Sequence, residues 1–491
     1  MKLAELIKNC GVTAVRGPLD LEITSVTNDS RKVCQGSLFV AVNGCGNDGR
    51  AYISKALEAG ASAILCEDDG RQELHNPESG AAFVFVQDSR SAVAYAADCF
   101  YGHPSSKLKL VGITGTNGKT TTVTLLYHLF RSMGYECGLL STIANYVGSK
   151  RLETANTTSD PVTINSLMSQ MVEAGCEYCF MEVSSIGVEQ ERVSGLDFNV
   201  GIFSNLTHDH LDYHGSFAEY LRCKKLFFDR LGSDAIAITN IDDKHGEVML
   251  QNTAARKVSY SCRSAADHNC RILEESFEGM LLRIDGTEVW SRLIGAHNAY
   301  NLLAIYSTAV ELGEGKEEVL LALSKLESAP GRLQTIHGPR GLCAVIDYAH
   351  TPDAMENVLK TLRDVAPEKQ LVCLFGCGGD RDRTKRPEMA AVAEKWADRI
   401  FVTSDNSRTE KTEDIMEDIR AGFSPAGLAK AVFIADRKEA IRTALMFSPD
   451  GSTVLLAGKG HENYQIIGTE KRHFDETEIV TEIFKQCCTT L

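Results

Sequence analysis

Residues 111–122 read Val-Gly-Ile-Thr-Gly-Thr-Asn-Gly-Lys-Thr-Thr-Thr, and this stretch decides the fold. The apolar run at 108–113 predicts a buried strand, and apolar residues at helical spacing over 123–130 predict a helix after it. A glycine-rich turn between a strand and a helix presents backbone N–H groups and a helix N-terminus to an anion. Lys119 can reach the β- and γ-phosphates of a nucleotide, and the Thr120 hydroxyl can bind Mg²⁺. The stretch therefore predicts a phosphate-binding loop.

The loop departs from the commonest nucleotide-binding pattern. That pattern has a glycine five residues before Gly118, where this chain has Ile113. The glycines stand instead at Gly115 and Gly118, so the motif is the shorter Gly-x-x-Gly-Lys-Thr. A strand-to-helix turn with incidental glycines is the alternative. Because the strand, the lysine, the threonine and the helix agree, we interpret the loop as a site for nucleotide phosphates.

Composition narrows the class of protein. The chain has 491 residues, too many for one core, and its 43% hydrophobic and 24% charged content is that of a soluble globular protein. It has no apolar run of about 18 residues and no secretory signal, so we expect a cytoplasmic protein without a membrane segment. The net charge of −15 argues against nucleic acid as a partner. An anionic substrate must therefore be held by local positive charge.

Composition shifts at 101–107 and 328–331 predict three domains. We expect an α/β protein with a small α/β domain at 1–105, a central domain with a P-loop-type parallel sheet at 106–330, and a Rossmann-like domain at 331–491. Short alternating strands at 271–294 indicate an antiparallel hairpin added to the central domain. Buried strands are expected at 178–183, 200–205 and 235–240, and at 343–347, 371–375, 400–403, 431–434 and 453–456.

Polar clusters follow several of these strands. In the last domain they lie at 347–350, 376–382, 404–408 and 458–462. In open α/β sheets, ligands bind beyond the carboxyl ends of the strands. Four clusters at one edge therefore predict a binding site, with plain polar turns as the alternative.

Two clusters in the central domain suggest metal chemistry. Glu182 ends an apolar strand, where a carboxylate is costly unless it is paired or binds a metal. Thr120 and Glu182 would suit the few protein oxygens that Mg²⁺ takes beside ATP, and a structural salt bridge of Glu182 is the alternative. The His- and Asp-rich run at 205–214 follows another strand and predicts a metal or catalytic site.

Together, these motifs resemble the Mur ligase family, the ATP-dependent amide ligases of peptidoglycan synthesis. The resemblance covers the whole chain. It rests on the short phosphate loop and on motifs at 29–31, 36–41, 156–158, 295–301, 330–332 and 347–353. The last of these, Asp-Tyr-Ala-His-Thr-Pro-Asp, is highly specific to these ligases.

Within the family, the sequence is most similar to the members that add the third amino acid of the peptide. The resemblance implies that meso-2,6-diaminopimelate is joined to the D-Glu γ-carboxylate of UDP-N-acetylmuramoyl-L-alanyl-D-glutamate through an acyl phosphate. It implies ATP and Mg²⁺ as cofactors, formation of ADP, and a part in cell-wall biogenesis, cell shape and cell division. We expect a monomer.

The resemblance also implies roles for individual residues. The ATP-binding residues would be Gly115, Thr116, Asn117, Gly118, Lys119, Thr120, Thr121 and Asn298. The UDP-sugar-peptide would be held by Ser30 in a UDP-recognising first domain and by Thr157, Thr158, Ser184 and Arg192.

Metal and catalytic roles follow in the same way. The catalytic residues would be Lys119, Glu182, His210 and Lys224, and the metal ligands Thr120, Glu182, His210 and Lys224. Lys224 matches the family's carbamylated lysine, whose carbamate would bind a second Mg²⁺ with His210. Without the resemblance, Lys224 would be interpreted as an ordinary lysine on a helix surface.

The amino acid would be bound in the last domain, by Arg381, Asp405, Asn406, Ser407, Arg408, Gly458 and Glu462. Arg408 can pair with the distal carboxylate of diaminopimelate, which lysine lacks, and Glu462 would take the distal ammonium. A site that buries an arginine for that carboxylate should reject lysine, since the arginine would be left unpaired. Ser407 stands where the family motif has proline, and Ile186 where the family usually has histidine.

Three alternatives remain open. The first is the same ligation with L-lysine or another diamine. The second is a folylpolyglutamate synthetase, which shares the fold but lacks a UDP-type first domain. The third, from another class, is a nucleotide-binding regulatory protein that hydrolyses ATP without ligation.

Overall fold

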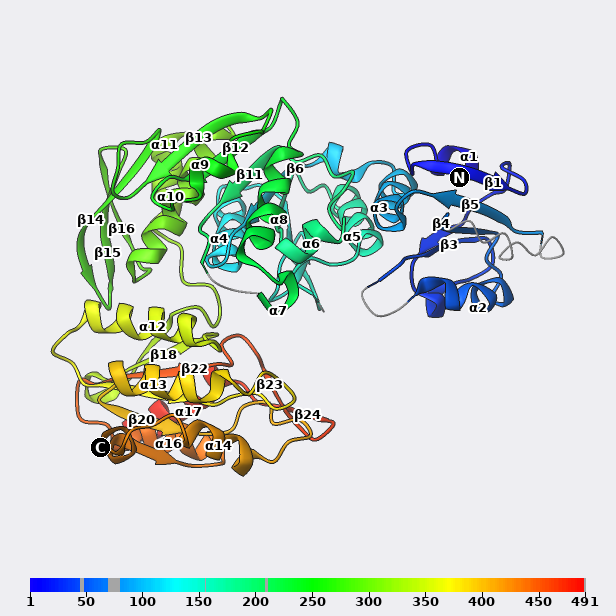
Figure 1. Cartoon of the computed structure of the whole chain (residues 1–491). Helices are drawn as coiled ribbons and strands as arrows, with labels where there is room; N and C mark the ends of the chain where they lie inside the picture. Colours follow the sequence, from blue (N-terminus) through cyan, green and yellow to red (C-terminus); the bar gives the residue numbers. More distant parts are fainter. Residues whose placement is uncertain (45–47, 69–79, 155, 208–210, 490–491) are drawn as a thin grey trace. The chain divides into compact units, whose positions relative to one another are not determined.

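The computed structural model describes residues 1–44, 48–68, 80–154, 156–207 and 211–489 (Figure 1). Contacts between residues divide it into two compact units. The first unit consists of residues 1–269 and 300–322, and the second of residues 270–299 and 323–491. No helix within the described ranges is long and apolar enough to cross a membrane.

The chain begins with a five-stranded sheet in the order β1-β5-β4-β3-β2. Its strands are β1 (Val12–Arg16), β2 (Ser25–Thr27), β3 (Ser37–Ala41), β4 (Ala63–Glu67) and β5 (Ala82–Val86). Strands β3 and β5 are buried along their whole length because helices cover both faces. Helices α1 (Leu3–Leu6) and α3 (Ser89–Phe100) contribute to the core on one face, and α2 (Ile53–Glu58) to the core on the other.

The central sheet places β6 (Lys109–Thr114) between β10 (Tyr178–Glu182) and β11 (Val200–Phe203), with all three strands parallel. The loops that follow these strands therefore meet at one edge of the sheet. On one side the sheet continues through β7 (Cys137–Leu140) to β8 (Asn145–Val147) and β9 (Lys150–Leu152). On the other it continues through β12 (Ile236–Asn240) to β13 (Arg256–Ser261).

The helices of the first unit include α4, which follows the phosphate loop directly, and α8, whose inner face joins the core beside β11. Helices α5, α6 and α8 are capped at their N-termini by the side chain of an aspartate or a serine. This side chain accepts a hydrogen bond from a backbone N–H of the first turn, which has no partner within the helix. The bounds are α4 (Lys119–Ser132), α5 (Pro161–Glu173), α6 (Ser185–Glu189), α7 (Leu211–His214), α8 (Phe217–Asp229), α9 (Gly246–Met249), α10 (Ala296–Glu311) and α11 (Lys316–Leu323).

The predicted hairpin is confirmed. Strand β14 (His268–Ser276) pairs antiparallel with β15 (Gly279–Ile284), which pairs antiparallel with β16 (Thr287–Ser291). The two residues between β15 and β16, Asp285 and Gly286, have φ values of +45° and +90°. This is the left-handed backbone that a tight hairpin turn requires.

The second unit contains a six-stranded sheet in the order β17-β18-β22-β19-β20-β21, parallel except for β17. Its strands are β17 (Gln334–His337), β18 (Cys343–Asp347), β19 (Leu371–Phe375), β20 (Arg399–Val402), β21 (Ala431–Phe433) and β22 (Thr453–Ala457). A separate hairpin consists of β23 (Tyr464–Ile467) and β24 (Glu470–His473).

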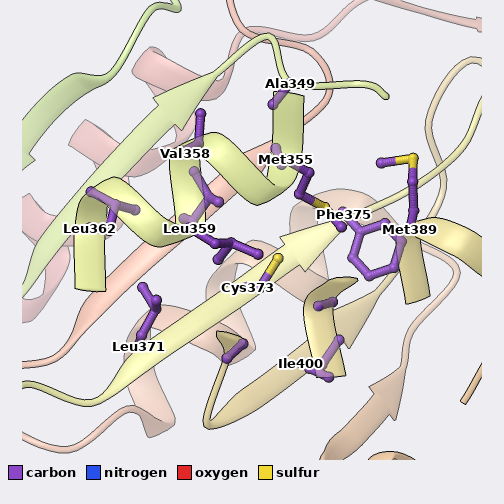
Figure 2. Packing of buried hydrophobic residues seen from close by; sticks show 14 of the residues in the cluster. Ala349, Met355, Val358, Leu359, Leu362, Leu371, Cys373, Phe375, Met389 and Ile400 are labelled. Carbon is purple, nitrogen blue, oxygen red and sulfur yellow. The ribbon is translucent and has the colours of Figure 1, made fainter. Parts of the chain in front are cut away.

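Alternate residues of β19 supply two different cores, as the period of a strand requires. Leu371, Cys373 and Phe375 face α12 (Pro352–Val365) and α13 (Lys385–Trp396), where the apolar residues of α12 cover them (Figure 2). Val372 and Leu374 belong to the core on the opposite face, with α16 (Arg437–Phe447) and α17 (Glu476–Thr489). The remaining helices are α14 (Thr412–Arg420) and α15 (Pro425–Lys430). The predicted Rossmann-like α/β fold, with helices on both faces of a mostly parallel sheet, is therefore confirmed.

Candidate active site

The phosphate loop leaves β6 and enters α4 through two glycines whose conformations exclude a side chain. Gly118, the N-cap of α4, has a φ of +87°, and a Cβ there would lie 2.5 Å from Asn301 Oδ1. Gly115 has a φ of +155°, and a Cβ there would collide with the hydroxyl of Ser204. Glycine is the residue that tolerates such backbone and such close approach.

The loop is fixed by the segment that follows β11. The backbone N–H of Thr116 donates to Asn205 O at 2.8 Å, and that of Asn117 donates to Asn205 Oδ1 at 3.0 Å. Ser204 Oγ donates to Asn117 O at 2.7 Å, and the Thr207 N–H donates to Thr116 Oγ1 at 3.0 Å. The beginning of the predicted His/Asp-rich cluster therefore lies against the loop, whereas residues 208–210, including His210, lie outside the described residues.

Two lysine ammonium groups converge on one carbonyl of this loop. Lys119 Nζ donates to the carbonyl oxygens of Gly115 and Thr116, at 2.9 Å each. Lys224 Nζ, from α8, donates to Gly115 O at 2.8 Å, and only 1% of the residue is exposed. The interpretation of Lys224 as a helix-surface lysine is therefore wrong. Its neighbour Lys225 pairs with Asp229 of the same helix instead.

Glu182 is fully buried at the end of β10 and lies beside α4. Its Oε2 accepts a hydrogen bond from Thr120 Oγ1 at 3.0 Å, and its Oε1 accepts one from the Thr142 N–H at 2.8 Å. Within the described part of the chain, no ion-pair partner of Glu182 is found, so the alternative of a structural salt bridge is not supported there. A buried carboxylate that accepts hydrogen bonds only from uncharged groups keeps a negative charge that a cation can neutralise. Carboxylate oxygens are ligands that Mg²⁺ prefers.

The predicted sugar-peptide residues lie around the end of β10. Thr158 Oγ1 donates to Glu182 O at 2.9 Å and accepts from the Ser184 N–H at 3.0 Å. Arg192 Nη1 donates to Thr158 O at 2.6 Å, and burial lowers the pKa of this guanidinium from its ordinary value. Thr157 accepts a hydrogen bond from Thr142 Oγ1 at 3.0 Å.

A cavity of about 180 Å³ is lined by Arg192 together with Asn28 and Arg90 from the N-terminal part of the same unit. Ser30 lies two residues from Asn28, in a 3₁₀ helix over Ser30–Lys32, but is not one of the lining residues. The structure therefore brings four of the five predicted sugar-peptide residues together by hydrogen bonds, and Ser30 is not among them.

Residues that sequence reasoning missed connect these parts. Tyr213 donates its hydroxyl to Glu189 Oε2 at 2.6 Å and accepts from Gln190 Nε2 at 2.8 Å. Gln190 Oε1 in turn accepts from Arg192 at 2.6 Å, and Glu189 pairs with Arg90 of the first domain at 3.3 Å. The position of Tyr213 in the His/Asp-rich run was the available signal.

The two asparagines of the predicted motif at 295–301 have different surroundings on α10. Asn301 accepts a hydrogen bond from Thr122 Oγ1 at 3.4 Å and lies against Gly118. The predicted ATP-binding residue Asn298 is buried, and its Nδ2 donates to Ile294 O at 2.8 Å.

In the second unit, the four polar clusters do meet at one edge of the sheet, since β18, β22, β19 and β20 are parallel neighbours. Asn406 Nδ2 donates to Glu462 Oε2 at 2.9 Å, and Asn406 Oδ1 accepts from the Ile466 N–H at 2.9 Å. Gly458 has a φ of +113°, and a Cβ there would lie 3.0 Å from Asp405 Oδ2.

Two arginines flank Gly378 in this cluster. A Cβ at Gly378 would lie 3.0 Å from Arg408 Nη1 and 3.8 Å from Arg381 Cγ. Arg408 Nη1 donates to Gly379 O at 2.8 Å, and Arg381, which is exposed, donates to Asp380 O at 3.2 Å. Arg408 has a φ of +50°, so the turn after the buried Ser407 holds a left-handed residue. The two guanidinium groups supply local positive charge on an acidic protein.

The sequence matches known proteins along its whole length. Residues 22–101, 113–309 and 331–460 match family models described as Mur ligase family, catalytic domain; Mur ligase middle domain; and Mur ligase, glutamate ligase domain. The chain is 50% identical over 485 residues to the UDP-N-acetylmuramoyl-L-alanyl-D-glutamate--2,6-diaminopimelate ligase of Parabacteroides distasonis, with 99% of each chain covered.

The chain belongs to the Mur ligase family. A protein of Clostridium acetobutylicum with the same name, numbered 1, is 40% identical over 99% of this chain and all of its own. A solved structure of a UDP-N-acetylmuramoyl-L-alanyl-D-glutamate--2,6-diaminopimelate ligase is 31% identical, with a TM-score of 0.72 and 99% of each chain covered. A folylpolyglutamate synthase of Mycobacterium tuberculosis shares the fold at 18% identity and a TM-score of 0.60, but covers 74% of this chain.

In this Mur ligase, the loops that follow β19 and β20 are joined by a buried arginine that sequence reasoning missed. Arg386 has no exposed surface in its side chain and pairs with Glu410 at 2.9 Å and with Asp418 at 2.7 Å. It also donates to Gly378 O at 3.2 Å, so it links the loop after β19 to the loop after β20. The hydrogen bond from Arg386 lowers the pKa of Glu410 to about 2.

Proposed function

We propose that this Mur ligase joins meso-2,6-diaminopimelate to the D-Glu γ-carboxylate of UDP-N-acetylmuramoyl-L-alanyl-D-glutamate, with ATP converted to ADP and phosphate. The observation that carries the proposal is the 50% identity over 99% of the chain to a ligase of that name. The product would be a peptidoglycan precursor, made in the cytoplasm by a monomer. The predicted domains at 1–105, 106–330 and 331–491 would respectively bind the UDP group, ATP and the amino acid.

The first half of the reaction would take place at the phosphate loop. Residues 115–121 would hold the ATP phosphates through backbone N–H groups, with Asn298 toward the adenine. The γ-carboxylate of the D-glutamyl residue attacks the γ-phosphate, and an acyl phosphate and ADP form. On binding the nucleotide, Lys119 would exchange its carbonyl partners for phosphate oxygens, and its charge would stabilise the transferring group.

Magnesium fits the residues of this site. Thr120 and Glu182 would hold one Mg²⁺, since Glu182 is a buried carboxylate beside that hydroxyl. His210 and a carbamylated Lys224 would hold a second. When bound, the ions would neutralise phosphate charge during the transfer.

The sugar-peptide would be positioned by Thr157, Thr158, Ser184 and Arg192, with Ser30 toward the uridine. Thr158 and Ser184 are joined to each other and to the end of β10 by hydrogen bonds. Because Glu182 ends the same strand, these residues would bring the D-Glu carboxylate to the nucleotide site with little freedom.

The second half of the reaction needs the amine that the second unit would supply. Arg408 and Arg381 would bind the distal carboxylate of diaminopimelate, and Glu462, with Asp405, Asn406, Ser407 and Gly458 around it, would bind the distal ammonium. The free amine attacks the acyl phosphate, and the tetrahedral intermediate collapses to amide and phosphate. Water must be excluded meanwhile, since it would hydrolyse the acyl phosphate.

A phosphate-release assay tests the reaction class. We expect phosphate from ATP only when both the UDP-dipeptide and an amino acid are present. Turnover without the amino acid would favour the regulatory, nucleotide-hydrolysing alternative. Turnover with a folate substrate in place of the UDP-dipeptide would favour the folylpolyglutamate synthetase.

A further inference from the structure

A buried ammonium lies inside the candidate amino-acid site. Lys459, in the loop after β22, has no exposed side-chain surface. Its Nζ lies 3.0 Å from Glu462 Oε2 and 3.7 Å from Asp405 Oδ1, and donates to Asn406 Oδ1 at 3.4 Å. Three residues expected to contact the substrate therefore already contact this lysine.

The surroundings fix where this ammonium is. The rings of Tyr464 and Phe474 lie 5.6 and 6.0 Å from it, and both attract a cation. The nearby buried Glu476 is paired with Arg437 at 2.8 Å. The carboxylates of Asp405 and Glu462 are therefore the ones that Lys459 neutralises, and a buried ion is tolerated only with such partners.

The arrangement leaves one oxygen for a ligand. Both the Lys459 ammonium and the Asn406 amide contact Oε2 of Glu462. Its Oε1 accepts no hydrogen bond from the residues that the structure describes. Asp405 and Glu462 thus carry two negative charges and hold one cation, so there is charge for one further ammonium.

We propose that Lys459 is a specificity-determining residue, whose fixed positive charge makes the site prefer an amino acid with two carboxylates over a simple diamine. The proposal rests on the proposed function. Among the five charged side chains proposed to contact the amino acid or each other, the two carboxylates of Asp405 and Glu462 face the three cations Arg381, Arg408 and Lys459, so this set of five carries one net positive charge. Diaminopimelate with a neutral attacking amine carries one net negative charge, whereas lysine in the same state carries none. Removal of Lys459 takes away the net charge that distinguishes them.

The test compares Lys459→Met, Lys459→Arg and wild type, each as the full chain with saturating ATP and UDP-dipeptide. Methionine keeps length and apolar bulk, and arginine keeps the charge. For Lys459→Met we expect the KM for diaminopimelate to rise about tenfold or more and the preference for diaminopimelate over lysine to fall about tenfold, with a smaller change in kcat. Lys459→Arg should retain the preference. The control is Lys438→Met, an exposed lysine of α16.

Three results would overturn the proposal. One is an unchanged preference in a folded Lys459→Met variant, and the second is an equal loss with both amino acids, which would mean that Lys459 only holds the loop. The third is loss of the preference in Lys459→Arg, since its charge is retained. A wild-type enzyme that ligates neither amino acid would instead refute the proposed function.

Wild-type enzyme provides a test that requires no variant to fold. Pimelate has the two carboxylates of diaminopimelate without amines, and 1,5-diaminopentane has two amines without carboxylates. A site with net positive charge should be inhibited more strongly by pimelate, in competition with diaminopimelate. Stronger competition by the diamine would contradict the proposal.

Discussion

At the scale of single residues, Lys224 shows how the fold changes the meaning of a side chain. On the sequence it is one of two adjacent lysines in a helix, yet the structure buries it and directs its ammonium at Gly115 O, 2.8 Å away. The resemblance implies that this buried side chain is carbamylated, and the Lys224→Arg variant tests that role.

Lys224→Arg separates carbamylation from simple positive charge. Arginine retains the charge but forms no carbamate under these conditions, so we expect ligation to fall about a hundredfold or more. Lys225→Arg, with its partner Asp229 still in reach, should be near wild type. Full activity in Lys224→Arg would mean that a carbamate is unnecessary.

Glu182→Gln tests the buried carboxylate without a change in size. The amide retains an oxygen that can accept from Thr120 or the Thr142 N–H but loses the charge that attracts Mg²⁺. We expect kcat to fall about a hundredfold and the Mg²⁺ concentration for half-maximal rate to rise. The exposed Glu173 of α5 is the matched control, as Glu173→Gln. An unaltered Mg²⁺ dependence would exclude Glu182 as a ligand.

At the scale of elements, the sequence predicted those features that a short run of residues determines, and not the contacts between distant segments. The phosphate loop and strands such as β10 and β19 were predictable, because an apolar run followed by glycine or polar residues marks a buried strand and its loop. Pairing across the site was not predictable: Lys459 meets Asp405, and Arg386 meets Glu410, through tertiary packing alone. The prediction of a Rossmann-like sheet also does not indicate which face of a helix contains a buried arginine.

Arg386 acts between elements, because it binds both the loop after β19 and the loop after β20. Arg386→Met removes the buried guanidinium that binds the partly exposed carboxylates of Glu410 and Asp418, so we expect the second unit to lose about 1.5–3 kcal/mol of stability. Denaturant unfolding monitored by Trp396 fluorescence measures this. The exposed Arg420, as Arg420→Met, is the control and should change stability little.

The pH dependence of stability checks the same contact. The folded pKa of Glu410 is about 2, below the ordinary value, because of Arg386. The stability that this contact contributes is therefore complete above the unfolded pKa, near the ordinary value of 4.5, and is lost as the pH falls toward 2. In Arg386→Met, the free energy of unfolding should therefore fall less than in wild type as the pH is lowered through this range. An identical acid profile in both proteins would contradict the assignment.

At the scale of the whole molecule, the two units carry different halves of the proposed chemistry. The nucleotide loop, Glu182 and the sugar-peptide residues belong to residues 1–269, while Arg381, Arg408 and Glu462 belong to residues 323–491. Against the net charge of −15 of the whole chain, Arg381 and Arg408 supply positive charge locally. Choice of the amino acid is therefore expected to depend on the second unit, and binding of the ATP phosphates on the first.

The most direct test of this account is a ligation assay that offers meso-diaminopimelate and L-lysine side by side to wild type and to Arg408→Ala. Wild type should attach diaminopimelate to the UDP-dipeptide almost exclusively, with one ADP for each amide bond. Arg408→Ala should lose diaminopimelate ligation while its affinity for ATP is unchanged, because the guanidinium that pairs with the distal carboxylate is gone. A wild-type preference for lysine, or full diaminopimelate ligation by Arg408→Ala, would contradict the account.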